Sequence, residues 1–69
     1  MKLHYYPETD SLYIDLNARP SVDSREISDG LVIDFDEQGA IVGIDIQEAS
    51  SRLDLSAVET EALPLLGQR

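Results

Sequence analysis

Acidic and amide side chains recur near the middle of the chain at a spacing that suits a cation. Asp34, Asp36 and Gln38 alternate, Gly39 follows them, and Asp45 is the twelfth residue counted from Asp34. The calcium loop of an EF-hand has a similar order, with oxygen ligands at its first, third and fifth positions, a glycine at the sixth and a carboxylate at the twelfth. Asp34, Asp36 and Asp45 are therefore candidate metal ligands.

The sequence around this pattern argues against a calcium site. An EF-hand loop lies between two helices, whereas here apolar and polar residues alternate on both sides, which is typical of β-strands. Gln38 would supply a neutral ligand, and Asp45 is shorter than the bidentate glutamate of the calcium loop. We therefore predict a turn with solvated acidic side chains, with no bound metal and no cofactor, and keep the cation site as the alternative.

His4, Ser11 and Asp15 are the residue types of a hydrolytic triad. In the strand pairing derived below, His4 and Ser11 are diagonal neighbours about 7–8 Å apart at Cα, which is too far for a hydrogen bond. The sequence has no glycine-rich nucleophile turn, and a flat sheet offers no pocket. We expect His4 to stack beside Tyr13 on an exposed face and expect no enzymatic activity.

Asp15, Asp34 and Asp45 fall on polar strand faces, so they converge if the strands that carry them are neighbours. Like charges opposite one another destabilise a sheet by roughly 0.2–1 kcal/mol per pair. A convergent cluster would therefore attract a divalent cation or an arginine from a partner. We prefer a solvated face, because the order of the strands does not follow from the sequence.

The first sixteen residues predict a β-hairpin. Apolar side chains alternate with polar ones on both sides of the segment 7–10, whose proline, threonine and aspartate are typical of a turn. Only one register places the apolar residues on one face. It pairs Tyr6 with Ser11, Tyr5 with Leu12, Leu3 with Ile14 and Lys2 with Asp15.

Residues 31–46 predict a second hairpin with residues 36–39 as its loop. Gly39 provides the positive φ that closes such a loop without strain at Cβ. A three-residue loop is disfavoured because it would bring Asp45 beside the apolar residues Leu31 and Ile33. The preferred register pairs Phe35 with Ala40, Ile33 with Val42 and Leu31 with Ile44.

The remaining elements are shorter. Val22–Ile27 is polar enough for an edge strand, and Ser28–Gly30 forms the turn after it. Glu48 and Arg52 have the spacing of one helical turn. Ser56 and Glu59 form a capping box, which predicts a helix over 57–63 that ends at Pro64 and docks on the sheet, while Gly67–Arg69 frays.

These elements predict one α+β domain over residues 1–69. Its antiparallel sheet has four to five strands, formed by two β-hairpins and a polar edge strand, and one short C-terminal helix covers the apolar face. A chain of this length has a thin core, and it has no cysteine for disulfides, so we expect self-association to add stability.

Composition limits the classes of partner. Fourteen acidic residues against five Lys and Arg give a formal net charge of −9, which repels nucleic-acid phosphates and anionic membranes and attracts basic proteins. There is no apolar run of about 18 residues and no basic-then-apolar leader. We therefore expect a cytoplasmic protein that binds neither nucleic acid nor membranes.

Three segments of the chain resemble a known family. They are an aromatic residue, an acidic turn and Leu-Tyr-Ile over residues 6–14, the acidic and apolar segment 29–36, and the segment 39–46 followed by Glu48, Ala49 and Ser50. In this order they resemble DUF2283, a bacterial and archaeal family of unknown function. The resemblance covers roughly residues 1–53 and implies a small domain of a sheet and a helix, without catalytic residues to transfer.

Large side chains also lie opposite the predicted core. Tyr6 and Tyr13 share the outer face of the first hairpin, and Val32 and Ile41 share that of the second. Such residues can form an interface, so we expect a homodimer that uses them. The function we predict is a non-enzymatic binding or assembly module that self-associates and binds a basic protein. The alternative is a divalent-cation-binding domain or small metal-dependent enzyme using the three candidate aspartates.

Overall fold

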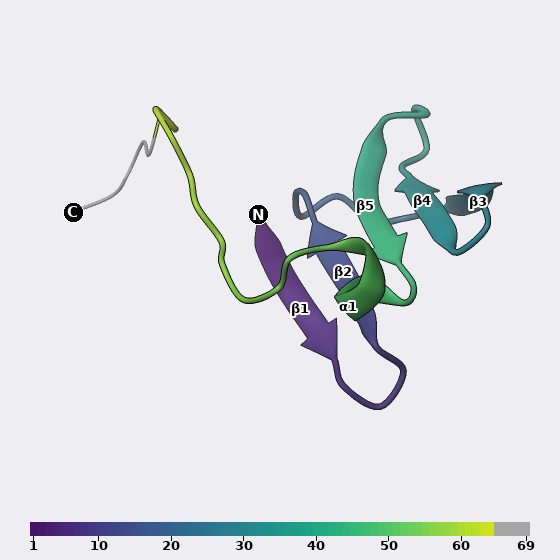
Figure 1. Cartoon of the computed structure of the whole chain (residues 1–69). Helices are drawn as coiled ribbons and strands as arrows, with labels where there is room; N and C mark the ends of the chain where they lie inside the picture. Colours follow the sequence, from purple (N-terminus) through teal and green to yellow (C-terminus); the bar gives the residue numbers. More distant parts are fainter. Residues whose placement is uncertain (65–69) are drawn as a thin grey trace.

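The computed structural model describes residues 1–64, which form a five-stranded antiparallel sheet and one short helix (Figure 1). In space the strands follow the order β1-β2-β5-β4-β3, so the two hairpins meet where β2 pairs with β5. No helix of the described part is long and apolar enough to cross a membrane. The elements are β1 (Lys2–Tyr6), β2 (Ser11–Asp15), β3 (Asp23–Ser28), β4 (Leu31–Phe35), β5 (Ile41–Ile46) and α1 (Ala49–Arg52).

Strands β1 and β2 pair in the register that the alternation predicts. Tyr5 lies opposite Leu12 and Leu3 opposite Ile14, which places these four apolar side chains on one face. Lys2 faces Asp15 and Tyr6 faces Ser11 in the same ladder, again as predicted.

The register of β4 with β5 was predicted wrongly by two residues. Ile33 lies opposite Ile44 rather than Val42, and Leu31 lies opposite Ile46 rather than Ile44. Because a shift of two residues preserves the alternation, these four side chains still share a face.

A β-bulge explains the difference. The Asp36 amide donates to the carbonyl of Ala40 at 2.8 Å, so the turn has the odd length that we disfavoured. The ladder then shifts between Phe35, which faces Ile41, and Asp34, which faces Gly43. The odd turn alone would place the apolar side chains of β4 and β5 on opposite faces. The bulge puts two residues of β5 opposite one of β4, and this extra residue returns them to the same face.

Strand β3 forms the polar edge that the sequence predicts, displaced by one residue towards the C-terminus. It pairs only with β4 and ends at a turn that contains Gly30 with φ 77°. The guanidinium of Arg25 on this strand lies 4.4 Å from the centre of the Phe35 ring, a cation–π contact at the edge of the apolar face.

The predicted helix over 57–63 is wrong. Residues 53–64 contain no helix, and both the amide and the hydroxyl of Ser56 donate to Asp54 Oδ1, so Ser56 does not cap Glu59. A seven-residue helix is too short to form without packing, and the residue before a proline disfavours helical geometry. The frayed end expected at Gly67–Arg69 lies outside the described residues.

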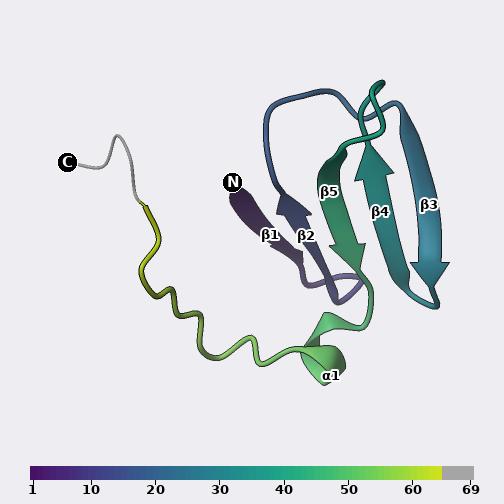
Figure 2. The same ribbon diagram turned by 90° about the horizontal axis from the view of Figure 1, so that it is seen from above.

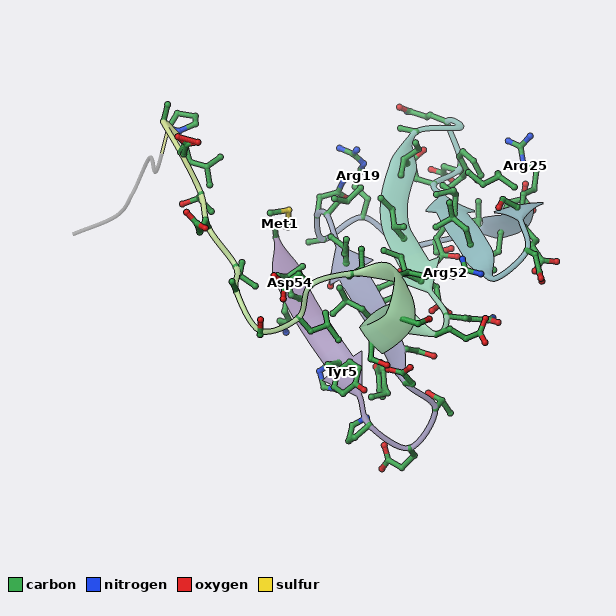
Figure 3. All side chains as sticks on the ribbon, viewed as in Figure 1. Met1, Tyr5, Arg19, Arg25, Arg52 and Asp54 are labelled. Atoms are coloured by element: carbon green, nitrogen blue, oxygen red, sulfur yellow. The ribbon has the colours of Figure 1, made fainter. Side chains whose placement is uncertain are left out.

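Helix α1 is the single turn suggested by the Glu48 and Arg52 spacing, whose charged groups are 3.7 Å apart. It lies at one end of the sheet, beside the β1–β2 and β3–β4 turns, rather than across the apolar face (Figure 2). Arg52 reaches the β3–β4 turn and donates to the Asp29 carbonyl at 2.8 Å (Figure 3). Gly30 leaves room for it, since a Cβ there would lie 2.9 Å from the guanidinium.

Asp10 attaches α1 to the first hairpin. Its carbonyl accepts from the Ala49 amide at 2.8 Å, and its carboxylate accepts from the Ser50 hydroxyl and the Tyr5 hydroxyl, both at 2.7 Å. The Ser50 hydroxyl and then the Tyr5 hydroxyl hold the pKa of Asp10 below its usual value. Ala49 is completely buried as a result of this attachment.

The apolar face of the sheet is only partly buried. Among residues 1–64 the buried apolar side chains are Ile33, Val42 and Ala49, and no large side chain is fully buried. Leu3 and Tyr5 on the edge strand are 47% and 40% exposed. From residue 53 the chain continues as an extended segment that leaves the sheet (Figures 1 and 2), bordering a hollow of about 420 Å³ on this face.

The attachment of α1 predicts a loss of stability in acid. Folding lowers the pKa of Asp10, so the ionised carboxylate stabilises the folded state at any pH above its unfolded pKa of about 3.9. This stabilisation is lost as the pH falls through the pKa of Asp10 in the folded state. Ser50→Ala should raise the pKa of Asp10 and reduce the difference between urea midpoints at pH 7 and pH 3. Carboxyl NMR titration and urea unfolding would measure both.

The neighbouring variant Ser51→Ala is the matched control, because the Ser51 hydroxyl donates to the Glu48 carbonyl and touches no carboxylate. It should leave the pKa of Asp10 unchanged. Equal titration of Asp10 in the two variants would contradict this account of α1.

Candidate functional site

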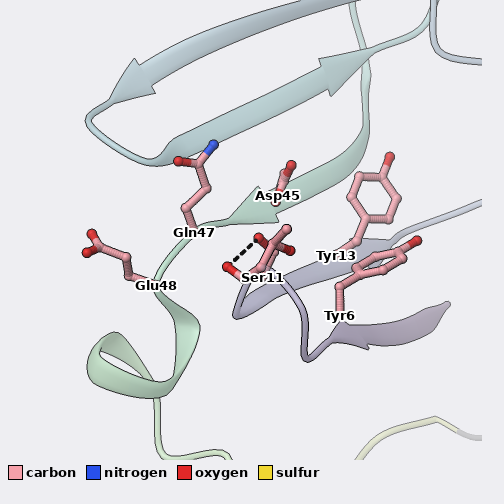
Figure 4. Close-up of a pocket in the computed structure, with 7 residues that line it drawn as sticks. Tyr6, Ser11, Tyr13, Asp45, Gln47 and Glu48 are labelled. Carbon is pink, nitrogen blue, oxygen red and sulfur yellow. Dashed lines mark hydrogen bonds between the residues drawn. The ribbon is translucent and has the colours of Figure 1, made fainter.

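A pocket of about 740 Å³ opens on the polar face, between the β1–β2 hairpin and the end of β5 (Figure 4). Strand alternation places its walls, since Tyr6 faces Ser11 across one ladder and Tyr13 faces Asp45 across the next. The lining combines two aromatic rings, two carboxylates and several neutral polar groups: Tyr6, Thr9, Ser11, Tyr13, Asp45, Gln47 and Glu48.

One wall of the pocket is held by a hydrogen-bonded chain that spans four strands. The Tyr13 hydroxyl on β2 donates to Asp34 Oδ2 on β4 at 2.6 Å, although β5 lies between these strands. The hydroxyl of Ser24 on β3 donates to the other carboxylate oxygen of Asp34, also at 2.6 Å. The ring of Tyr13 is therefore fixed at both its Cα and its hydroxyl.

Gly43 makes this crossing feasible. It lies on β5 opposite both Asp34 and Asp15, and a Cβ built on it would overlap the hydroxyl of Tyr13. A glycine inside a strand often marks such a close approach. The glycine within this strand was therefore a sequence signal for a close contact, but the sequence did not indicate that the Tyr13 hydroxyl makes it.

The acidic surroundings change the titration of Tyr13. The hydrogen bond to Asp34 raises the pKa of Tyr13 to about 12, with further contributions from burial and from the charges of Asp34, Asp15 and Asp45. The three aspartates that the sequence places on polar faces thus gather around one tyrosine. Within residues 1–64, however, no three acidic or histidine side chains are grouped as metal ligands.

Asp45 has a different environment from Asp34, although both border Tyr13. Its Oδ1 atom is shielded from solvent and has no hydrogen-bond partner within the described residues. Buried polar atoms normally have a partner, because an unpaired one loses its hydration without compensation. Asp45 therefore carries a negative charge that residues 1–64 leave partly uncompensated.

Asp36, the second member of the calcium-like pattern, organises the turn after β4. Its Oδ1 accepts from the amides of Ala40 and Gln38, both at 2.9 Å, and its Oδ2 accepts from Arg19 at 2.8 Å. The Ala40 and Gln38 amides and then Arg19 keep the pKa of Asp36 low. Asp34, Asp36 and Asp45 thus lie in three separate environments.

The residues of the hydrolytic triad are not joined either. His4 faces Tyr13 in the ladder, but its ring contacts Tyr6, with 4.2 Å between ring centres. The Ser11 hydroxyl donates to the carbonyl of Thr9 at 3.4 Å rather than to His4.

The outer residues predicted as an interface occupy two places. Tyr6 and Tyr13 line the pocket together, and Val32 lies beside it opposite Asp45. Ile41 is at the β-bulge, opposite Phe35, and is 46% exposed. Their role as an interface stays a prediction.

Comparison with known proteins places the chain in a family. The family model described as a protein of unknown function, DUF2283, matches residues 2–50. The chain belongs to the DUF2283 family. The DUF2283 match confirms the resemblance, includes all five strands and ends within α1. No curated protein and no solved structure was found to match the chain.

The close approach at Gly43 predicts a strong coupling between two residues. Gly43→Ala should lower the free energy of unfolding by about 1–3 kcal/mol, the usual cost of overpacking, because the new methyl group displaces the Tyr13 hydroxyl. In a Tyr13→Ala background the same change should cost much less. A double-mutant cycle of urea unfolding at fixed protein concentration measures the coupling, and additive effects would refute it.

The charge of Asp34 predicts the titration of Tyr13. In Asp34→Asn the pKa of Tyr13 should fall from about 12 towards the ordinary value of about 10, because the carboxylate that favours the protonated phenol is gone. NMR of ¹³C-labelled tyrosine above pH 9 follows the change. Asp23→Asn, an exposed acidic residue on the edge strand, should leave it unaltered. A wild-type value near 10 would contradict the contact.

Proposed function

We propose that this DUF2283 chain is a non-enzymatic binding module that self-associates through the apolar face of its sheet and binds a basic protein with its polar face. The observation that carries this proposal is the incompletely buried apolar face, most exposed at Leu3 and Tyr5. Strands β1, β2, β4 and β5 contribute nine apolar side chains to it: Leu3, Tyr5, Leu12, Ile14, Leu31, Ile33, Phe35, Ile44 and Ile46. The edge strand β3 adds one ion pair at the border of this face, Asp23 opposite Phe35 and Arg25 opposite Ile33.

The exposure of this face supports an association. In monomeric proteins a large continuous apolar surface is uncommon, and it usually marks a site of interaction. Burial of apolar area contributes about 25 cal/mol per Å², so side chains that are half exposed in one chain gain most from a cover. Two sheets pack face to face about 10 Å apart, which is the simplest way to cover such a surface.

The distribution of charge favours a second copy as the occupant. The chain has a net charge of −9, yet its acidic residues lie on the polar face, in turns and after residue 46, apart from Asp23 on the edge strand, which lies opposite Phe35. A basic partner would find one carboxylate there, Asp23 at the edge of the face, and it already lies 3.9 Å from the guanidinium of Arg25. Two copies related by a two-fold axis would place apolar surface on apolar surface and keep most of their carboxylates apart.

The polar face has the opposite character and suits the basic partner. Asp15, Asp34 and Asp45 all act on the same tyrosine there. An acidic field attracts cationic surfaces and accelerates their association, particularly at low ionic strength.

Two substitutions on β1 test which face self-associates. Leu3 and Tyr6 lie on the same edge strand, are 47% and 46% exposed, and project from opposite faces. Leu3→Asp should weaken dimerisation at least tenfold, because it introduces a charge into an apolar interface, whereas Tyr6→Asp should change it less than twofold. Light scattering and sedimentation over a concentration series measure the mass, with circular dichroism as a check of folding.

A wild-type mass of one 7.7 kDa chain at high concentration would overturn the proposal. Dissociation by Tyr6→Asp but not by Leu3→Asp would assign the interface to the outer face instead. Leu3→Ser serves as a milder variant if Leu3→Asp does not fold.

A further inference from the structure

The pocket between the β1–β2 hairpin and β5 has the composition of a site for an organic cation. Its lining includes Asp45 and Glu48 but no basic residue, and it presents the rings of Tyr6 and Tyr13. Cations are attracted to the faces of aromatic rings as well as to carboxylates, more strongly where water is partly excluded. In Figure 4 the Tyr6 and Tyr13 side chains stand together on one side of the site, with Asp45 between Tyr13 and Gln47.

Asp45 supplies an independent reason to expect a cation. Its Oδ1 is buried without a partner in the described part of the chain, whereas Asp34 already accepts from the hydroxyls of Tyr13 and Ser24. Glu48 is also partly compensated, since it lies 3.7 Å from Arg52. Burying a carboxylate oxygen without a partner costs free energy, and of the two carboxylates in this pocket Asp45 bears the larger cost. An incoming positive charge would therefore stabilise Asp45 more than Glu48.

We propose that the pocket receives the guanidinium group of an arginine on a basic protein, with Asp45 as its counter-ion and the rings of Tyr6 and Tyr13 as its walls. The inference names the contact through which the binding module described above recognises its basic partner, and so rests on that proposed function. Guanidinium suits this lining better than ammonium, because it is planar, stacks on aromatic rings and is more weakly hydrated.

The rigidity of the site supports a side-chain ligand. Tyr13 is anchored through its hydroxyl, and Asp45 lies opposite it in the β2–β5 ladder, so two walls come from paired strands rather than loops. Because these side chains are already held in place, binding loses less conformational entropy. The pocket also lies on the face opposite the apolar surface, so occupation by arginine leaves that surface free for a second copy.

The test uses three blocked tripeptides that differ in one side chain. The full-length ¹⁵N-labelled protein is titrated with acetyl-Gly-Arg-Gly-amide, with its lysine analogue and with its citrulline analogue, which keeps the shape of arginine but has no charge. NMR should show saturable shifts for the arginine peptide that concentrate at Tyr6, Tyr13, Asp45 and Gln47. The lysine peptide should bind several-fold more weakly, and the citrulline peptide should cause no saturable shift.

Asp15 provides the matched control for Asp45, since both lie on the polar face and both act on Tyr13. Asp45→Asn should weaken binding of the arginine peptide at least tenfold, whereas Asp15→Asn should weaken it less than twofold. Equal losses in the two variants, or shifts scattered over the acidic surface, would show general attraction by the net charge and overturn the site. Equal binding of lysine and arginine would overturn the assignment to guanidinium.

Light scattering on the same samples separates this inference from the proposed self-association. A dimer that gives no localised shift with the arginine peptide refutes the pocket and leaves the apolar interface standing. A monomer that binds the peptide through Asp45 refutes the interface and leaves the pocket standing.

Discussion

The arrangement of both faces depends on one irregularity, the β-bulge between β4 and β5. The turn after β4 has a length that would place Asp45 opposite Leu31, on the apolar side. The bulge adds one residue to β5, so Asp45 instead faces Val32 and projects from the polar face. Without this correction the carboxylate of Asp45 would lie within the apolar surface, and the pocket would keep only that of Glu48.

The separation of faces gives this thin sheet two different surfaces. A single layer cannot enclose a core, so the apolar side chains gain shelter only from neighbours outside the sheet. Helix α1 does not provide this shelter, because Asp10, Asp29 and Gly30 hold it at the end of the strands. The same helix carries Glu48 at its start to the rim of the polar pocket. Helix α1 thus contributes to the polar face and leaves the apolar face without a helical cover.

Much of the sheet could be predicted from the sequence, but contacts between distant segments could not. The β1–β2 register followed from alternation around one turn, because a slip would have mixed the faces. The prediction of the β4–β5 register failed because the three-residue turn and the one-residue bulge each shift the alternation by one residue. Together the two shifts preserve the alternation, so the sequence pattern does not reveal them. The capping pattern at Ser56 failed because local hydrogen bonds to Asp54 replaced the helix. The hydrogen bond between Asp10 and Ser50 joins residues that no periodicity relates.

The candidate site shows the same division. Alternation placed Asp15, Asp34 and Asp45 on polar faces, yet only the strand order shows that they surround Tyr13. Gly43 then explains why Asp34 accepts a hydrogen bond from Tyr13 and Asp45 does not. Because Gly43 has no side chain, the Tyr13 hydroxyl reaches across β5 and donates its hydrogen bond to Asp34. It therefore does not donate to Asp45, which is the cross-strand neighbour of Tyr13. The absence of a Cβ at one position thus both fixes the aromatic wall and leaves the adjacent carboxylate without a donor from Tyr13.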